Sequence, residues 1–223
     1  DRTLLEAGKR PDHKRGIIVT NHHLYWPPNA MYERLRQGWI IRRQLAQFKK
    51  KHAFPAFMCG DFNSVPKSPL YRVLTGKPLE PQHHEELKEI PTSYALNDDA
   101  TAVAPSAHPD PAAVTFKPYV EFVEDFEAMP PCQSAYAQYT ALHPEMASTE
   151  WEGESRFTNY AVWQGTLDYV MQVMDADSKD VRLLQLLRLP SEDMCRPGLP
   201  NRVYSSDHLC IMAEYALPPE SPA

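Results

Sequence analysis

Short apolar runs separated by polar turns recur along this sequence and predict an α/β fold. Residues 16–20 (Gly-Ile-Ile-Val-Thr) and 56–59 (Ala-Phe-Met-Cys) are each predicted to form a buried strand. Between them, apolar side chains of the segment 31–52 recur at helical spacing, which predicts an amphipathic helix. These side chains are Leu35, Trp39, Ile40, Leu45 and Phe48. A strand, a helix and a second strand of these lengths form one α/β unit.

The rest of the chain divides into an acidic middle and a strand-rich end. Residues 68–75 are predicted to form a short helix. Residues 80–155 contain fifteen Asp and Glu against two Lys, and the surrounding sequence is rich in Pro and Ala. This composition predicts a variable surface insertion at 77–156, disordered around 100–113. Three further strands are predicted after it, at 166–173, 181–189 and 208–217.

Polar residues follow the second predicted strand directly. Asp61 and Asn63 alternate within an extended Gly-Asp-Phe-Asn segment, so both side chains face one side while Phe62 turns toward the core. A carboxylate is a hard oxygen ligand for Mg²⁺ or Mn²⁺ and can also orient an attacking water. An amide can donate to a phosphate oxygen. This tetrapeptide also occurs as a simple turn, so its meaning depends on the motifs that follow.

A third carboxylate and a histidine lie near the end of the chain. Asp168 occurs in Gly-Thr-Leu-Asp-Tyr, and Asp207 and His208 are adjacent in Ser-Asp-His. Adjacent residues in an extended segment point to opposite faces, so one can bind a metal ion while the other contacts a phosphate. A carboxylate beside an imidazole fixes its tautomer and favours its protonated form, which makes Asp168 the candidate partner of His208. A helix N-cap or a turn is the alternative interpretation of Ser-Asp-His.

His23 ends the first predicted strand as Asp61 ends the second. Open α/β sheets keep their binding sites just beyond strand ends. Phosphate contact is therefore the functional interpretation of His23, and a structural histidine is the alternative. The adjacent His22 leaves the choice between the two imidazoles open.

The charge distribution, the apolar runs and the cysteines limit the classes of protein to which this chain can belong. Residues 1–60 contain twelve Lys and Arg against four Asp and Glu, a net of +8, while residues 61–223 contain eleven against twenty-five, a net of −14. The basic part fits either a polyanion-binding surface or the solvated face of the predicted helix. No apolar run is long enough to insert into a membrane. The four cysteines show neither close pairing nor zinc spacing, which predicts reduced thiols in an intracellular protein.

Taken in order, these motifs resemble those of the endonuclease/exonuclease/phosphatase superfamily with the DNase I-like fold. The Thr-Asn-Tyr and Gly-Thr-Leu-Asp-Tyr pair, followed by Gly-Leu-Pro-Asn, is similar to its deadenylase-related branch. The Tyr-Trp-Pro-Pro turn at 25–28 is most similar to fungal Ngl-type RNA exonucleases. The motifs are Asn-His-His-Leu-Tyr-Trp at 21–26, Gly-Asp-Phe-Asn-Ser at 60–64, Phe-Thr-Asn-Tyr at 157–160, Gly-Thr-Leu-Asp-Tyr at 165–169 and Ser-Asp-His at 206–208.

The resemblance implies a four-layer α/β/β/α sandwich and Mg²⁺-dependent phosphodiester hydrolysis, with Mn²⁺ as the other candidate ion. At the matching positions, Asp61 would bind metal and position the attacking water, and Asp207 would support the metal. His208, held by Asp168, would hydrogen-bond the phosphate or move its proton.

The resemblance also implies contacts with the substrate. Asn63 would bind the scissile phosphate, His23 would be a second phosphate contact, and Asn159 of the Thr-Asn-Tyr motif would contact the substrate. The preferred function is a metal-dependent 3′–5′ exoribonuclease acting on single-stranded RNA. The alternatives are a phosphatase acting on inositol phosphates or on another substrate of the superfamily, and a truncated, inactive RNA-binding module.

This sequence departs from the family pattern near its beginning. The family's metal-binding Glu, and an Asn on its first strand, lie well upstream of Asn-x-His-Leu. Only Glu6 precedes that motif here, without a strand-like context. The resemblance therefore implies that residues 1–223 form a single partial domain lacking the N-terminal part of the fold. We hypothesise that this chain alone is weakly active or inactive.

Overall fold

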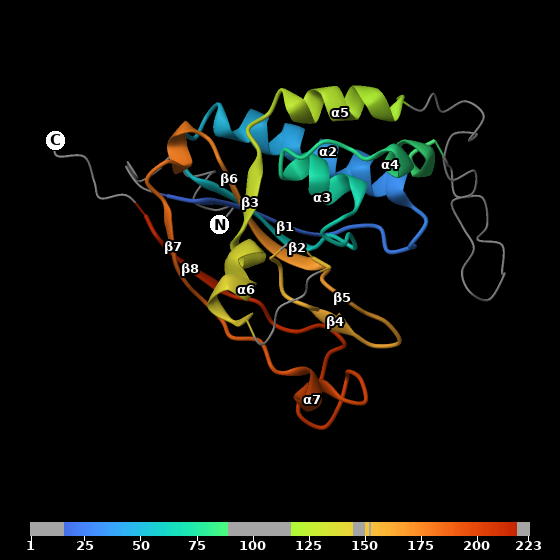
Figure 1. Cartoon of the computed structure of the whole chain (residues 1–223). Coiled ribbons are helices and arrows are strands. Elements are labelled where there is room, and N and C mark those ends of the chain that lie inside the picture. The colour runs from blue at the N-terminus through green and yellow to red at the C-terminus, as the bar shows by residue number, and fades with distance from the viewer. Residues whose placement is uncertain (1–15, 89–116, 145–149, 152, 218–223) are drawn as a thin grey trace, which may run out of the picture.

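The computed structural model describes residues 16–88, 117–144, 150–151 and 153–217. Its centre is a four-stranded sheet in the order β1-β2-β6-β3. The first two strands are parallel, and the other two neighbouring pairs are antiparallel. The strands are β1 (Ile18–His23), β2 (Ala56–Asp61), β3 (Cys132–Ser134) and β6 (Asp168–Val173). Figure 1 shows this sheet between a layer of helices and a set of shorter strands.

The helical layer covers one face of the sheet (Figure 1). Its helices are α2 (Met31–Lys49), α3 (Pro69–Leu74), α4 (Pro81–Glu86) and α5 (Tyr119–Glu127). The predicted helices at 31–52 and 68–75 are confirmed as α2, which ends three residues earlier than predicted, and α3, which is one residue shorter at each end. Trp39 on α2 donates to a carboxylate oxygen of Asp125 on α5 at 2.6 Å, which fixes the two helices side by side. Leu35, Leu70 and Phe122 are almost fully buried beneath this layer.

The prediction that the whole segment 77–156 is a surface insertion is wrong for its second half. Phe122 and Phe126 lie four residues apart on α5 and are buried in the core cluster beneath the helices, while Glu121, Glu124 and Glu127 of α5 are exposed. Strand β3 pairs with β6 in the central sheet. An acidic average composition concealed this periodic apolar face. The predicted disordered region at 100–113 lies outside the described residues.

Short strands and turns lie on the opposite face. Strands β7 (Arg182–Leu186) and β8 (Ala213–Ala216) pair with each other, and β4 (Asn159–Tyr160) pairs with β5 (Gln164–Gly165). Phe57 of β2 contacts Tyr215 of β8 with ring centroids 4.8 Å apart, so the β7–β8 pair packs on the central sheet. The predicted strand at 208–217 is confirmed only for its last part. The remaining elements are η2 (Ala135–Gln138), α6 (Tyr139–Leu142), η4 (Ala176–Ser178) and α7 (Glu192–Cys195).

A buried carboxyl group joins the two layers. Glu154 is completely buried, and the Tyr71 hydroxyl donates to its Oε1 at 2.7 Å. Burial raises the pKa of Glu154 to about 7, because the charged form loses its hydration. The Tyr71 hydrogen bond opposes this rise in pKa without cancelling it.

We expect Glu154→Gln to stabilise the fold at pH 8 and to leave it unchanged below pH 4.5. The unfolded carboxyl group ionises near 4.5 while the folded one stays protonated to about 7, so the unfolding free energy of the wild type falls as pH rises between these values. The gain at pH 8 should be about 3 kcal/mol. Urea unfolding from pH 4 to pH 8 measures it, with Glu124→Gln on the exposed face of α5 as control. Parallel pH profiles for wild type and Glu154→Gln would refute the assignment.

Candidate active site

Three strand ends meet at one edge of the central sheet. Strands β1 and β2 run parallel and end at His23 and Asp61, while β6 runs antiparallel to β2 and begins at Asp168. The register pairs His23 with Asp61 and Asp61 with Asp168. Neighbouring strands lie about 4.8 Å apart, so these side chains gather in one place although they are distant in sequence.

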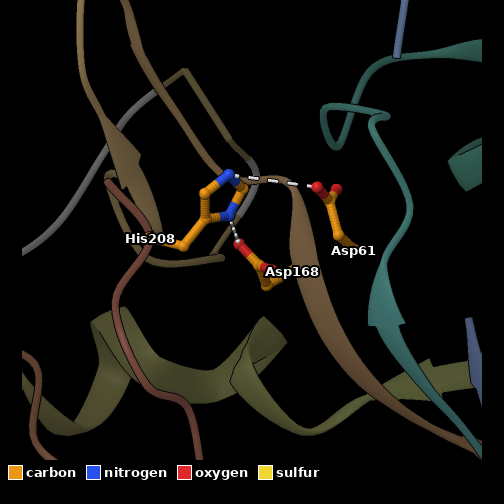
Figure 2. Close-up of side chains that lie close together, drawn as sticks. All are labelled: Asp61, Asp168 and His208. Carbon is orange, nitrogen blue, oxygen red and sulfur yellow. Dashed lines mark hydrogen bonds and ion pairs between the residues drawn. The ribbon is translucent and has the colours of Figure 1, made fainter. Parts of the chain in front are cut away.

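His208 completes a cluster with the two carboxylates (Figure 2). One potential ligand atom from each of Asp61, Asp168 and His208 lies within 4.8 Å of the others. The His208 Nδ1 atom lies 2.8 Å from Asp168 Oδ2, and its Nε2 atom lies 3.9 Å from Asp61 Oδ2. The imidazole therefore lies between the two carboxylates, as expected from the sequence for Asp168 and His208.

Thr158 orients Asp168, a role that the sequence analysis missed. Its hydroxyl donates to Asp168 Oδ2 at 2.6 Å and accepts the backbone N–H groups of Leu167 and Asp168 at 2.9 and 3.1 Å. The same carboxylate oxygen faces His208 Nδ1. Because Asp168 is an acceptor there, Nδ1 carries the proton, and Nε2 faces Asp61. The only sequence signal for Thr158 is its place in the Thr-Asn-Tyr motif.

The pKa values of two groups in the cluster, His208 and Asp61, are raised. The hydrogen bond to Asp168 raises the pKa of His208 above its usual 6.5, with the charges of Asp168, Asp61 and Asp207 adding to it and burial opposing it. Burial raises the pKa of Asp61, and the charge of Asp168 raises it further. This rise in the pKa of Asp61 is opposed by the hydrogen bond from the Asn63 N–H and by the charges of His208 and His23.

Asp168→Asn should lower the pKa of His208 toward 6.5, because the carboxylate hydrogen bond is the main cause of its rise. A raised histidine pKa stabilises the fold fully below pH 6.5, and this contribution is lost as pH rises through the folded-state pKa. The variant should lose that pH-dependent contribution. NMR titration of the imidazole resonances measures the shift, with Asp180→Asn as an exposed control. An unchanged His208 pKa would disprove the role of Asp168.

His23 and Asn63 flank Asp61 in different ways. His23 Nε2 lies 3.5 Å from Asp61 Oδ2, and its side chain is 71% exposed against 15% for Asp61. Asn63 adopts a left-handed backbone conformation with φ of 46°, and its N–H donates to Asp61 Oδ1 at 2.7 Å. Its side-chain amide donates to the Leu24 carbonyl at 2.8 Å. Asn63 thus ties Asp61 to the loop after β1, while His23 faces outward.

His22 points away from this edge. Its ring packs against Phe62 with centroids 4.4 Å apart, and neither ring nitrogen has a hydrogen-bond partner among the described residues. Burial lowers the pKa of His22 to about 4, so the imidazole is neutral at pH 7. Of the two adjacent histidines, His23 is the one beside Asp61. Phe62 is buried, as the alternation along the segment predicted.

Asn159 and Asp207 hold the His208 segment. Asn159 is 8% exposed, and its amide donates to the Asp207 backbone carbonyl at 3.3 Å. Asp207 itself is exposed, and within the described part of the chain its carboxylate is not one of the groups gathered around His208. No helix begins at Ser206 or Asp207, so the N-cap interpretation is wrong, but the Ser206 hydroxyl accepts the His208 N–H at 3.1 Å, which fits the turn interpretation. The substrate and metal roles of these two residues stay predictions.

The layers and this edge of the sheet define a DNase I-like α/β protein, as the sequence motifs indicated. The sequence pattern of the Endonuclease/Exonuclease/phosphatase family matches residues 4–208, and the chain belongs to that family. Among solved structures, the chain is similar to ANGEL2, described as a 2′,3′-cyclic phosphatase, with 23% identity and a TM-score of 0.57. The match covers 90% of this chain and 57% of the ANGEL2 chain. The human nocturnin catalytic domain is 17% identical with a TM-score of 0.50, covering 92% and 49%.

The curated relatives confirm the resemblance to fungal Ngl-type proteins. "Probable RNA exonuclease C9B6.11c" of Schizosaccharomyces pombe is 30% identical over 91% of this chain and 50% of its own length. RNA exonuclease NGL2 of Saccharomyces cerevisiae is 26% identical over 97% and 53%. The chain thus spans about half the length of these relatives. Among its described residues, no helix combines the length and apolar character needed to cross a membrane.

Proposed function

We propose that this chain carries catalytic residues of a metal-dependent hydrolase of RNA phosphodiester bonds, acting from the 3′ end of single-stranded substrates. One observation carries the chemistry: His208 is bound through Nδ1 to Asp168 and directs Nε2 toward Asp61. A carboxylate-bound imidazole beside a second carboxylate can accept or donate a proton at a reacting phosphate. The RNA substrate and the 3′–5′ direction rest on similarity to the fungal RNA exonucleases.

A divalent cation fits the donors at this edge. Asp61 is a hard oxygen ligand whose pKa is raised by burial and by the neighbouring Asp168, so a bound cation would offset an unfavourable charge. Asp61 would hold Mg²⁺ or Mn²⁺, with the exposed Asp207 as a further candidate ligand. When bound, such an ion supplies charge neutralisation at the phosphate and lowers the pKa of water.

The protein groups have distinct tasks in this proposal. Asp61 orients the attacking water. His208, kept in one tautomer by Asp168, donates a hydrogen bond or a proton through Nε2 to a phosphate oxygen. His23, exposed beside Asp61, provides a second contact to the phosphate. Asn63 fixes the loop after β1 and binds the scissile phosphate.

Hydrolysis of single-stranded RNA labelled at its 5′ end tests this function. With Mg²⁺ or Mn²⁺ the chain should produce a weak ladder that shortens from the 3′ end, because we expect this chain alone to have low activity, and EDTA should abolish the ladder. RNA binding without cleavage under all conditions would instead identify a binding module. Release of phosphate from inositol phosphates without RNA cleavage would identify a phosphatase.

We also infer an intracellular location. The four cysteines, Cys59, Cys132, Cys195 and Cys210, are unpaired in the described structure. Unpaired thiols in a chain of this size are typical of a reducing compartment. Detection of a disulfide in the protein isolated from cells would contradict this location.

A further inference from the structure

A groove lies beside His208. Its volume is about 840 Å³, within the usual range of about 300–1,000 Å³ for small-molecule sites. One wall is formed by residues 187–191 together with Met194, and the other by residues 203–206 and 208–210. His208 belongs both to this lining and to the cluster with Asp61 and Asp168. The groove therefore adjoins the candidate active site through His208, although neither Asp61 nor Asp168 lines it.

Asn201 connects the two walls. Its side-chain oxygen accepts the backbone N–H groups of Val203 and Tyr204, both at 2.9 Å. Its side-chain amide donates to the Met194 carbonyl on the opposite wall at 3.1 Å. A single side chain thus sets the separation of the walls before any ligand arrives, which reduces the ordering cost of binding. The proposed hydrolytic chemistry assigns no other task to this residue.

The lining has the charge and polarity that a nucleotide needs. Among the described residues that form it, Arg188 and His208 can carry positive charge and none has a carboxylate, although the whole chain has a net charge of −6. Met194 and Val203 expose apolar surface, at 54% and 72%, and the Tyr204 ring lies beside them in the lining. The positively charged side chains attract the phosphodiester backbone, and a base packs on the apolar and aromatic side chains.

We propose that this groove binds the nucleotides of the RNA strand that lie next to the scissile phosphate. The proposal rests on the proposed function, because it takes His208 as the group that contacts that phosphate. Val203 and Met194 form the surface against which a base lies, and Arg188 adds positive charge to the lining. Asn201 is a positioning residue, since it holds the walls and does not need to touch the substrate.

Two substitutions place a negative charge in the groove without touching the catalytic cluster. Val203→Glu and Met194→Glu change exposed side chains, so the fold should tolerate both. Each should weaken binding of a fluorescent 12-nucleotide single-stranded RNA by about tenfold, because like charges placed together oppose association. The measurement is fluorescence anisotropy in EDTA, where no hydrolysis occurs. Val120→Glu, a matched change on the exposed surface of α5, should bind as tightly as wild type.

The outcomes separate this inference from the proposed function. If wild type and both groove variants bind RNA equally tightly, the proposal that the groove binds RNA is wrong, while the proposed hydrolytic function is unaffected. The same result is expected if the groove binds a protein instead of RNA. If Val120→Glu weakened RNA binding as much as the groove variants, the loss of affinity would come from net charge alone, and the proposal that the groove binds RNA would also be wrong. Groove-dependent binding without any hydrolysis in Mg²⁺ would support the groove and contradict the proposed enzyme. Absence of RNA binding by wild type would contradict both.

Discussion

Asp61→Asn should reduce RNA hydrolysis by about a hundredfold to ten-thousandfold without destabilising the fold. The substitution removes the charge that binds a cation or orients water, whereas the amide oxygen can still accept the Asn63 N–H. Burial and the neighbouring Asp168 raise the pKa of Asp61, so the charged carboxylate is unfavourable in the folded protein at neutral pH. Single-turnover hydrolysis and urea unfolding at pH 7 measure the two effects.

Asp180→Asn provides the matched control, because Asp180 is exposed and distant in sequence from the cluster. It should leave both hydrolysis and stability unchanged. If Asp61→Asn retained activity within a few-fold of wild type, Asp61 would not be a catalytic ligand. If it instead lost stability along with activity, its role would be structural.

Gly60→Ala is expected to have the largest effect on stability. Gly60 has φ of +125°, and a Cβ atom there would lie 1.9 Å from the backbone oxygen of His22 on the neighbouring strand. Neither backbone can move without breaking the β1–β2 pairing that brings His23 beside Asp61. We expect a loss of about 3 kcal/mol or more in unfolding free energy, measured by urea denaturation.

Gly198→Ala is the control for this substitution. A Cβ atom at Gly198 would lie 3.3 Å from the nearest atom, the Ala161 carbonyl oxygen, so a small adjustment accommodates it. Its unfolding free energy should fall by less than about 1 kcal/mol. A Gly60→Ala protein as stable as Gly198→Ala would show that the close approach of β1 and β2 is not required.

The sequence was sufficient to predict the elements whose apolar residues follow one period. Strand β2 and helix α2 were found in this way, with Met58 of β2 and Leu35 of α2 fully buried. Strand β1 was also found, but its prediction as a buried strand is wrong, because Ile17 and Val19 are 50% and 53% exposed. Helix α5 was missed because its two buried aromatic residues lie within a strongly acidic segment. The pairing of β3 with β6 depends on contacts between distant residues, and no local pattern encodes it.

The site shows the same division. Asp61, Asp168, His208 and His23 follow strand ends or recognisable motifs, so they could be named from sequence. The distances between these side chains could not be predicted from the sequence, because the register of three strands sets them. Thr158 was missed because a buried threonine has no distinctive sequence signal until its hydroxyl is seen bonded to Asp168. The exposed position of Asp207 depends on the path of the loop before His208, which only the structure shows.

The central claim is that Asp168 and His208 act as one unit in phosphodiester hydrolysis. Single-turnover RNA hydrolysis by Asp168→Asn, His208→Ala and the double variant tests it most directly. Each single substitution should lower the rate by about a hundredfold or more, and the double variant should be no more than about threefold slower than His208→Ala. Such a result would show that Asp168 works through the imidazole. Rate losses that multiply in the double variant would contradict the account, because the two residues would then act independently.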